Sequence, residues 1–325
     1  MSVLETKDLT MSHGSRRGIQ NVSLQVESGE IFGFLGPNGA GKSTTIRILM
    51  GLLRASSGQA RIFGLDCWHY GDRIRRDVGY VAGDVRLYPW LTLNRGLKIV
   101  SQIHGKCLQA EGQQLADRFR LEPDLPVRKM SRGNRQKVAL VLALAIRPRL
   151  LILDEPTSGL DPLMQDTLMV CLRELAAEGR TVLFSSHTLS EVESQCDRVA
   201  MIRGGKIVEY DSLSSLKVKA PRRIQIQLSP GQQAPDCWPA GVQVLWQPPH
   251  SAAQQPSQAS QHHLLSIPPG QLSQTCLLEL TGRSGEFLQW VTGQGFADVS
   301  IGAPSLEILF RSCYAGETEQ AGAKA

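Results

Sequence analysis

Long apolar runs are missing from this chain of 325 residues. The longest, Val138 to Ile146, has nine residues, whereas a helix needs roughly 20 to cross a bilayer. The first residues, Met-Ser-Val-Leu-Glu-Thr-Lys, contain no apolar segment of the kind that secretory signals carry, so no signal peptide is expected. If the protein acts at a membrane, we expect a second chain to hold it there.

Paired cysteines and dense basic patches are also missing. The seven cysteines are odd in number, widely spaced and form no Cys-x-x-Cys, which argues against a disulfide framework or a zinc site and favours reduced thiols in the cytosol. The net charge is only +5, and the basic residues are scattered apart from two short runs, 73–76 and 217–223. A nucleic-acid surface normally gathers them, so no nucleic-acid partner is expected. The two runs are solvated faces or, alternatively, contacts for lipid headgroups or a membrane partner.

Glycine, by contrast, is concentrated at residues 36–44, directly after the apolar run 31–35. Such a strand, glycine-rich turn and helix, here expected to continue to about Leu53, is typical of a phosphate-binding loop. Glycines let backbone N–H groups converge on phosphate oxygens, Lys42 supplies a cation, and the Ser43 hydroxyl can bind Mg²⁺. The sequence therefore predicts a nucleoside triphosphate site. Its predicted residues are Gly36, Pro37, Asn38, Gly39, Ala40, Gly41, Lys42, Ser43 and Thr44.

The hydrophobic pattern predicts an α/β core with a parallel sheet, because apolar strand-like runs alternate with helical stretches. Residues 2–30 alternate apolar and polar residues, which is typical of antiparallel strands. Further strands are expected at 59–63, 78–81, 150–153 and 181–184, and helices over 92–146, with a break at 121–126, and over 162–178.

The composition changes near Leu216, which predicts a domain boundary there. We expect a first domain at 1–216, containing a helical subdomain at about 84–147, and a small α+β domain at 217–316. The second domain would contain strands at 224–228, 276–280 and 297–301, a helix at 285–292, and a last helix capped by Ser305. Residues 247–263 are polar and of low complexity, and the tail 317–325 is expected to be disordered.

Two carboxylates follow the apolar run 150–153, at the predicted end of a buried strand. Asp154 stands where a Mg²⁺ ligand is needed beside the phosphate loop, and Glu155 is placed to orient or deprotonate an attacking water. His187 ends the next predicted strand and is expected near the γ-phosphate. The alternative is that the two acids are exposed at a strand end and that the histidine is structural.

Ser131 and Gly133 stand at the start of the apolar helix that is predicted to run to Ile146. The serine alone would be an ordinary N-cap. Together with the glycine it can also form a second anion site, because helix N-termini attract phosphate groups. This second site would have no phosphate of its own.

Five motifs, in this order, resemble those of the ATP-binding subunit of an ABC transporter: GPNGAGKST, SRGNRQ, LLILDEP, SGLD and SSH. The resemblance covers about residues 2–215. It implies a P-loop NTPase core with antiparallel β and helical subdomains, with ATP and Mg²⁺ as ligands. It also implies a head-to-tail dimer, in which the signature helix of one subunit closes over ATP held by the other.

The resemblance further implies a role for each motif residue. These roles are phosphate and Mg²⁺ binding by Lys42, Ser43 and Thr44, Mg²⁺ support by Asp154, general base catalysis by Glu155, a switch function for His187, contact with the partner's ATP by Ser131 and Gly133, and contact between subunits by Asp161. The C-terminal pattern, with its closing segment 304–310, resembles the accessory domain of multidrug- and antibiotic-type ABC exporter ATPases.

Some positions depart from the family pattern. The usual glutamine after the Gly-Tyr-Val strand is replaced by Gly83, and Asp84, one residue later, is the candidate to bind Mg²⁺ instead. The aromatic residue that stacks on adenine falls near His13, whose smaller ring leaves GTP open as a substrate. In the signature, Arg132 and Asn134 replace a glycine and a glutamine.

We therefore expect a competent ATPase that drives a separate integral membrane permease, most simply as a homodimer at the cytoplasmic face of the inner (plasma) membrane. The contact with the permease is expected around 85–93, in the helical region, where Tyr88 and Trp90 lie. One alternative is a regulatory subunit with little turnover. Another is a non-transport ABC ATPase of translation or DNA repair, but this chain shows neither tandem modules nor a long coiled-coil insertion. A P-loop kinase or GTPase would not explain the signature segment.

Overall fold

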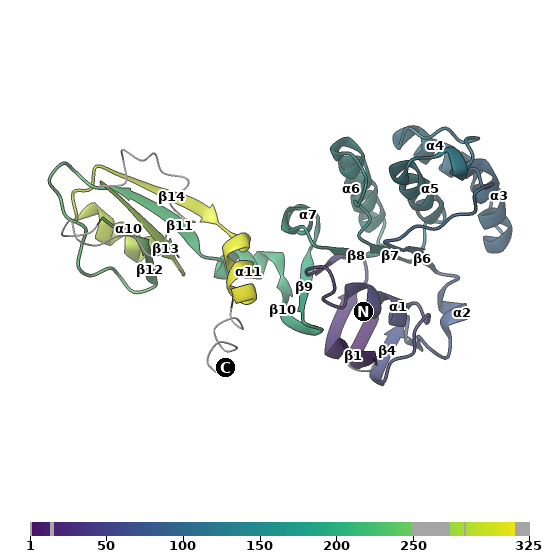
Figure 1. Ribbon diagram of the computed structural model, residues 1–325, viewed down its shortest axis with the longest axis horizontal. Helices are drawn as coiled ribbons and strands as arrows, with labels where there is room; N and C mark the ends of the chain where they lie inside the picture. The colour runs from purple at the N-terminus through teal and green to yellow at the C-terminus, as the bar shows by residue number, and fades with distance from the viewer. Residues whose placement is uncertain (1, 14–15, 249–273, 283, 316–325) are drawn as a thin grey trace. The chain divides into compact units, whose positions relative to one another are not determined.

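The computed structural model describes residues 2–13, 16–248, 274–282 and 284–315 (Figure 1). The chain divides into two compact units, residues 1–213 and 214–325. The boundary expected at residue 216 falls inside helix α8 (Leu213–Lys219). Most of the predicted low-complexity segment 247–263 and the whole tail 317–325 lie outside the described residues.

A six-stranded sheet forms the centre of the first unit, in the order β10-β9-β3-β8-β7-β6. Strands β3, β6, β7, β8 and β9 pair in parallel, and β10 adds an antiparallel edge. The predicted parallel sheet is confirmed, and its strands are almost entirely buried, as continuous apolar runs require. The bounds are β3 Ile31–Leu35, β6 Val78–Val81, β7 Leu150–Asp154, β8 Thr181–Ser186, β9 Arg198–Arg203 and β10 Lys206–Ser212.

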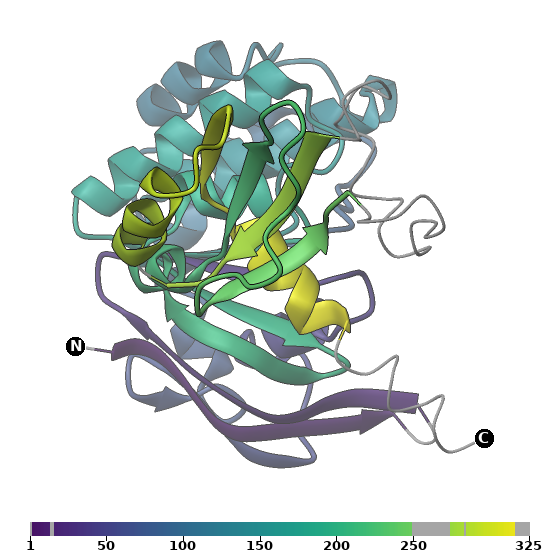
Figure 2. The same ribbon diagram turned by 90° about the vertical axis from the view of Figure 1, so that its left-hand side faces the viewer.

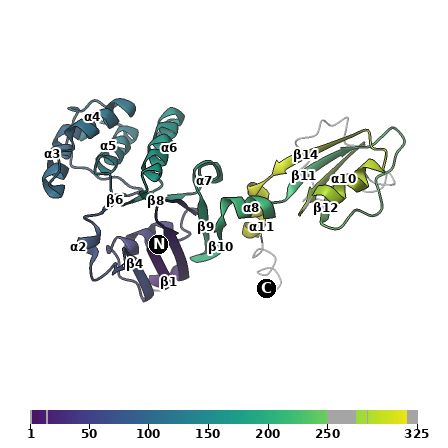
Figure 3. The same cartoon turned by 180° about the vertical axis from the view of Figure 1, so that it is seen from behind.

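Helices α3, α4 and α5 pack against one another next to β6 (Figures 1 and 3). They fall within the predicted helical region 92–146, and the predicted break at 121–126 lies between α4 and α5. The helices of this unit are α1 Lys42–Leu49, α2 Gly71–Ile74, α3 Leu93–His104, α4 Gln109–Arg118, the 3₁₀ turn η1 Val127–Lys129, α5 Arg132–Ala145, α6 Pro162–Ala177 and α7 Leu189–Gln195.

One helical expectation was wrong. Helix α1 ends at Leu49, not near Leu53, because Gly51 adopts φ +65° and its position faces the Cys67 carbonyl, where a Cβ would lie 2.4 Å from the oxygen. Residues 85–92, which precede the predicted helical stretch 92–146, form an irregular loop, and helix α3 begins at Leu93, after its Thr92 cap.

A second, antiparallel sheet packs on the central one in this unit, in the order β2-β1-β4-β5. Its two longest strands run side by side (Figure 2), which confirms the antiparallel strands predicted over 2–30. Leu4 and Val22 of this sheet share one buried core with Phe32 of β3 and Ile46 of α1. The bounds are β1 Ser2–His13, β2 Arg16–Glu27, β4 Ser57–Ile62 and β5 Leu65–Asp66.

The second unit contains a four-stranded antiparallel sheet in the order β12-β13-β11-β14. Ile224, Ile226 and Leu278 project from the strands into a core that also holds Phe287. At the start of the last helix, the Ile308 N–H donates to Ser305 Oγ at 3.4 Å. The bounds are β11 Arg222–Gln227, β12 Val242–Trp246, β13 Thr275–Leu280, α10 Ser284–Thr292, β14 Asp298–Pro304 and α11 Leu306–Ala315.

Candidate nucleotide-binding site

The glycine-rich loop joins β3 to α1, and close packing explains two of its glycines. A Cβ at Gly36 would lie 2.3 Å from the Ile202 carbonyl oxygen, inside any permitted contact distance. Gly41 adopts φ +113°, and a Cβ there would lie 2.5 Å from Ile19 Cγ2. The loop therefore needs glycine at these positions to turn tightly between strand and helix.

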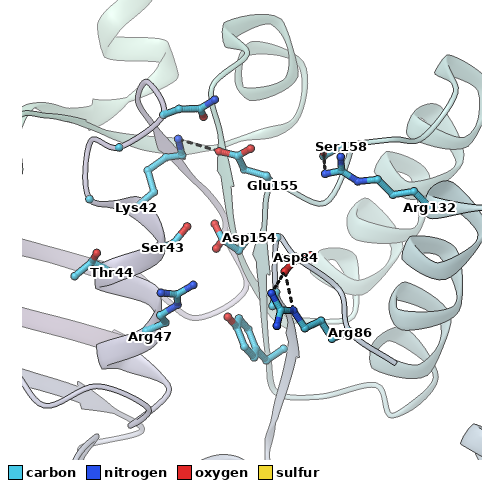
Figure 4. A pocket seen from close by; sticks show the side chains of 16 residues that line it. Lys42, Ser43, Thr44, Arg47, Asp84, Arg86, Arg132, Asp154, Glu155 and Ser158 are labelled. Atoms are coloured by element: carbon cyan, nitrogen blue, oxygen red, sulfur yellow. Dashed lines mark hydrogen bonds and ion pairs between the residues drawn. The ribbon is translucent and has the colours of Figure 1, made fainter. Parts of the chain in front are cut away.

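Lys42 begins helix α1, and its side chain is buried, with 4 % of its surface exposed. Its ammonium donates to the carbonyl oxygens of Gly36, at 2.7 Å, and Pro37, at 3.2 Å. It also forms an ion pair with Glu155, with 3.1 Å between Nζ and Oε1 (Figure 4). The lysine therefore lies between the phosphate loop and the carboxyl end of β7.

Asp154 is the last residue of β7, and its side chain is buried. Ser185, on the neighbouring strand β8, donates its hydroxyl to Asp154 Oδ1 at 2.6 Å and accepts the Glu155 N–H at 3.0 Å. Glu155 follows in a left-handed backbone conformation, φ +49°. His187 Nδ1 lies 3.5 Å from Glu155 Oε2. The ends of β7 and β8 thus bring the two predicted carboxylates and the predicted histidine together.

A cavity of about 540 Å³ opens between α1 and the end of β7. Within it the Ser43 side chain points toward Asp154 (Figure 4). The predicted residues that line the cavity are Asn38, Gly39, Gly41, Lys42, Ser43, Thr44, Asp84, Asp154 and Glu155. The predicted residues outside its lining are Gly36, Pro37, Ala40, Ser131, Gly133, Asp161 and His187.

Arg47, Tyr80 and Arg86 also line this cavity, although the sequence analysis did not single them out. For Arg47 a signal existed, since it lies four residues after Ser43 and therefore on the same face of helix α1. Burial raises the pKa of the Tyr80 hydroxyl, and the negative charge of Asp154 adds to the effect while Arg47 opposes it. Tyr80 thus stays neutral beside the carboxylates.

The signature turn lies at the start of α5, where Ser131 and Gly133 fall outside the lining of the cavity. Ser131 caps the helix by accepting the Asn134 N–H at 3.2 Å. A Cβ at Gly133 would lie 2.6 Å from the Gly159 carbonyl oxygen, so this turn packs closely on the Ser-Gly-Leu-Asp segment. Arg132 does line the cavity and donates to Ser158 Oγ at 3.3 Å (Figure 4).

Asp161 begins helix α6, where its carboxylate accepts the Met164 N–H at 3.0 Å as an N-cap. Asp161 therefore has a structural role within its own chain, in addition to the contact between subunits that is predicted for it. The His13 side chain, the candidate for base stacking, lies outside the described residues.

In the loop after β6, Gly83 stands at the position where the family has a glutamine. A Cβ at Gly83 would lie 3.2 Å from the Asp154 carbonyl oxygen and 3.6 Å from Asp154 Oδ2, so position 83 faces Asp154 without a side chain. The Asp84 carboxylate is instead paired with Arg86, at 2.9 Å, and both side chains are largely exposed.

Among the residues that the structure describes, no helix combines the length and the apolar character that crossing a bilayer requires.

Comparison with known proteins places this geometry in a family. The ABC transporter family model matches residues 19–158. The bacitracin transport ATP-binding protein BcrA of Bacillus licheniformis is 36 % identical over 236 residues, which cover 72 % of this chain and 77 % of BcrA.

Solved structures agree. A structure of an ATP-binding subunit of an ABC transporter is 32 % identical, with a TM-score of 0.62, over 66 % of this chain and 92 % of the other. The dimeric post-hydrolysis state of the ATP-binding cassette MJ0796 with ADP and phosphate is 25 % identical, with a TM-score of 0.59, over 65 % and 98 %. The chain therefore belongs to the ABC transporter ATP-binding proteins, and its first unit is an ATP-hydrolysing cassette.

Proposed function

We propose that this chain is the motor subunit of a membrane exporter and works as a homodimer that closes over two ATP molecules. The observation that carries the proposal is the division of the site: Lys42 lines the cavity of its own chain, whereas Ser131 and Gly133 do not. A second copy, placed head to tail, would bring its signature turn to that cavity. The dimeric cassette bound to ADP and phosphate supports this arrangement.

In the proposed site, Lys42 and the N-terminus of α1 bind the β- and γ-phosphates. Ser43 and Asp154 would hold Mg²⁺, which neutralises developing phosphate charge when bound. Their oxygens suit this hard cation, and Asp154 Oδ1 is already oriented by Ser185.

Glu155 is proposed as the general base. Its carboxylate lines the cavity and faces Lys42 on one side and His187 on the other. When triphosphate replaces the carboxylate as the partner of Lys42, Glu155 becomes available to take a proton from water at the γ-phosphate. His187, 3.5 Å from Glu155, would keep that carboxylate and the water aligned, which supports its proposed switch function.

We propose that the permease contacts the loop 85–93. This loop displays two large apolar side chains, Tyr88 with 70 % and Trp90 with 47 % of their surface exposed. Their rings stack on each other, with 5.6 Å between centroids, so the pair presents a preformed aromatic surface. Exposed aromatic clusters mark protein interfaces, and docking here would hold the chain at the cytoplasmic face of the membrane.

The decisive experiment uses a tagged Glu155→Gln chain, which should bind ATP, keep the dimer closed and hydrolyse slowly. The chain would be purified with Mg-ATP from detergent-solubilised membranes of the native host, and stoichiometric companions identified by mass spectrometry. A multi-span membrane protein is the expected companion. Recovery only from the soluble fraction, with ribosomes, DNA or nothing bound, would overturn the exporter proposal but leave the ATPase intact.

A regulatory subunit with little turnover is the second candidate. It is favoured by one observation, the missing side chain at Gly83 next to Asp154. Steady-state phosphate release by the purified chain, alone and with its membrane partner, distinguishes the two. Turnover that stays at background with the partner present would favour regulation.

A further inference from the structure

The first unit has a second large cavity, of about 470 Å³. It lies at the amino ends of the central strands, whereas the nucleotide cavity lies at their carboxyl ends. Asp77, Arg149 and Arg180 line this second cavity and immediately precede β6, β7 and β8. The nucleotide cavity instead lies where β6 and β7 end. Five residues of β7 separate the two ends, about 17 Å at 3.3–3.4 Å per residue, so the cavities are distinct.

The other wall of this cavity comes from the helical layer. His104 ends α3, Lys106 and Cys107 lead into α4, and the segment 145–148 follows α5. That segment is one of the two connections between the helices and the sheet. A ligand bound here would therefore contact both layers at their junction.

The charge of the lining is strongly one-sided. Five basic side chains line the cavity against two carboxylates, Asp77 and Glu111. The basic residues are Arg76, Lys106, Arg147, Arg149 and Arg180.

Three of these cations are already engaged. Arg147 pairs with Glu178 at 2.8 Å and with Glu111 at 3.5 Å, and Arg180 pairs with Glu178 at 3.3 Å and donates to the Pro148 carbonyl at 3.1 Å. Arg149 lies 3.9 Å from Asp77 and stacks over the Phe63 ring. These contacts fix the arginines in place around the cavity.

Arg76 and Lys106 differ from the other three. Neither forms an ion pair with a carboxylate anywhere in the described part of the chain. Both side chains are exposed on the rim of the cavity. Three arginines that are paired with carboxylates and two exposed cations without an ion pair thus line one cavity, an excess of positive charge that favours the binding of phosphate groups.

We propose that this cavity binds a phosphate-bearing ligand, separate from the nucleotide that is hydrolysed. The volume exceeds what a single phosphate occupies and falls in the range of small-molecule sites. Apolar side chains, Leu108, Ile146 and Pro148, also line it and would contact the remainder of the ligand. The phosphate belongs either to a soluble compound or to a lipid headgroup, since both present the same anionic chemistry.

Cys107 provides a local reporter, because it is exposed and lines the cavity. The proposed experiment follows its alkylation by iodoacetamide, read by peptide mass spectrometry, with and without inorganic pyrophosphate. It uses the full chain carrying Lys42→Ala, so that pyrophosphate does not act through the phosphate loop. Cys237, exposed in the second unit, serves as the internal control.

We expect pyrophosphate to slow alkylation of Cys107 at least threefold and to leave Cys237 unchanged. Arg76→Ala with Lys106→Ala should remove the protection, each variant being compared with itself in the absence of ligand. The matched control is Arg73→Ala with Lys98→Ala, which deletes two exposed cations outside the cavity and should keep the protection. Protection should also weaken as salt is raised.

Vesicles distinguish the two sources of phosphate. Protection by phosphatidylglycerol vesicles, but neither by phosphatidylcholine vesicles nor by pyrophosphate, would assign a lipid headgroup. Protection by pyrophosphate but not by phosphatidylglycerol vesicles would assign a soluble ligand. Equal alkylation of Cys107 under all conditions, or protection that survives loss of Arg76 and Lys106, would overturn the proposal.

Discussion

Helices α1 and α5 begin in similar ways, but α1 contributes Lys42, Ser43 and Thr44 to the lining of the nucleotide cavity, whereas α5 contributes Arg132 alone. Each is preceded by a small N-cap residue, Gly41 or Ser131, and leaves its first N–H groups without intrahelical partners. At α1 these groups adjoin Lys42 and face the carboxylates of β7 across a cavity. At α5 they adjoin the packed Gly133–Gly159 contact, and Ser131 and Gly133 lie outside the lining of that cavity. A helix N-terminus therefore becomes a complete phosphate site only where other elements supply the cation and the walls.

The substitution Glu155→Gln separates ATP binding from ATP hydrolysis at the cavity beside α1. The amide keeps the size of the side chain but cannot accept a proton from water. We expect kcat to fall by roughly 10² to 10⁴, as for loss of a general base. ATP affinity, measured by equilibrium binding, should change by no more than about threefold, which corresponds to less than 1 kcal/mol of binding free energy. A variant that hydrolyses at the normal rate would remove Glu155 from this role.

Gly133→Ala tests the α5 side of the comparison. The added methyl would stand 2.6 Å from the Gly159 carbonyl oxygen and force the neighbouring loop to move. Overpacking of this kind lowers the free energy of unfolding by about 1–3 kcal/mol. Because the signature turn would be displaced, we expect the rate of phosphate release at saturating Mg-ATP to fall about tenfold or more. Binding of ATP to the single chain should not change.

Gly285→Ala is the matched control, since a Cβ there meets nothing within 4 Å. It should leave hydrolysis unaffected. Normal turnover of Gly133→Ala would mean that the close packing of the signature turn does not matter for the reaction.

Substitutions of Asp84 and Arg86 test the proposed Mg²⁺ site, with smaller effects that should have opposite signs. Asp84→Ala should raise the Mg²⁺ concentration needed for half-maximal hydrolysis, whereas Arg86→Ala should lower it by releasing the carboxylate from its 2.9 Å ion pair. Because exposed pairs contribute about 0–1 kcal/mol, each shift should be up to about fivefold. Shifts in the same direction, or none, would exclude Asp84 as a metal-binding residue.

The smallest effect is expected from two helix caps. Ser131→Ala and Thr92→Ala each remove a side chain that accepts a backbone N–H at the start of a helix, at 3.2 Å in both cases. Each should lower the free energy of unfolding by about 1 kcal/mol, measured by urea denaturation. Only Ser131→Ala should also slow hydrolysis. Equal turnover of the two variants would reduce Ser131 to an ordinary cap.

The phosphate loop and the strand ends could be predicted because their chemistry is local. Residues 36–44 are contiguous, and the carboxyl ends of neighbouring parallel strands meet at one edge of a sheet, which brought Asp154, Glu155 and His187 together. The residue roles proposed at these positions await the variants above. Arg47 was missed although its spacing from Ser43 was a readable signal.

Other features depend on contacts that a linear reading does not contain. Strands β9 and β10 were not predicted, and β9 lies in the sheet through pairing with β3, which is far away in the sequence. The early end of α1 follows from a distant carbonyl at Cys67. The basic cavity gathers residues from several separate segments, so no motif marks it.

The backbone of Glu155 has one more consequence. A side chain in the left-handed region costs about 1–2 kcal/mol relative to glycine, which adopts this conformation freely. Glycine at position 155 would remove this strain, but it would also remove the carboxylate that pairs with the buried Lys42 at 3.1 Å. The strained backbone is therefore maintained by an ion pair at the nucleotide cavity, so any stabilised version of this cassette that changes position 155 must be screened for turnover at the same time.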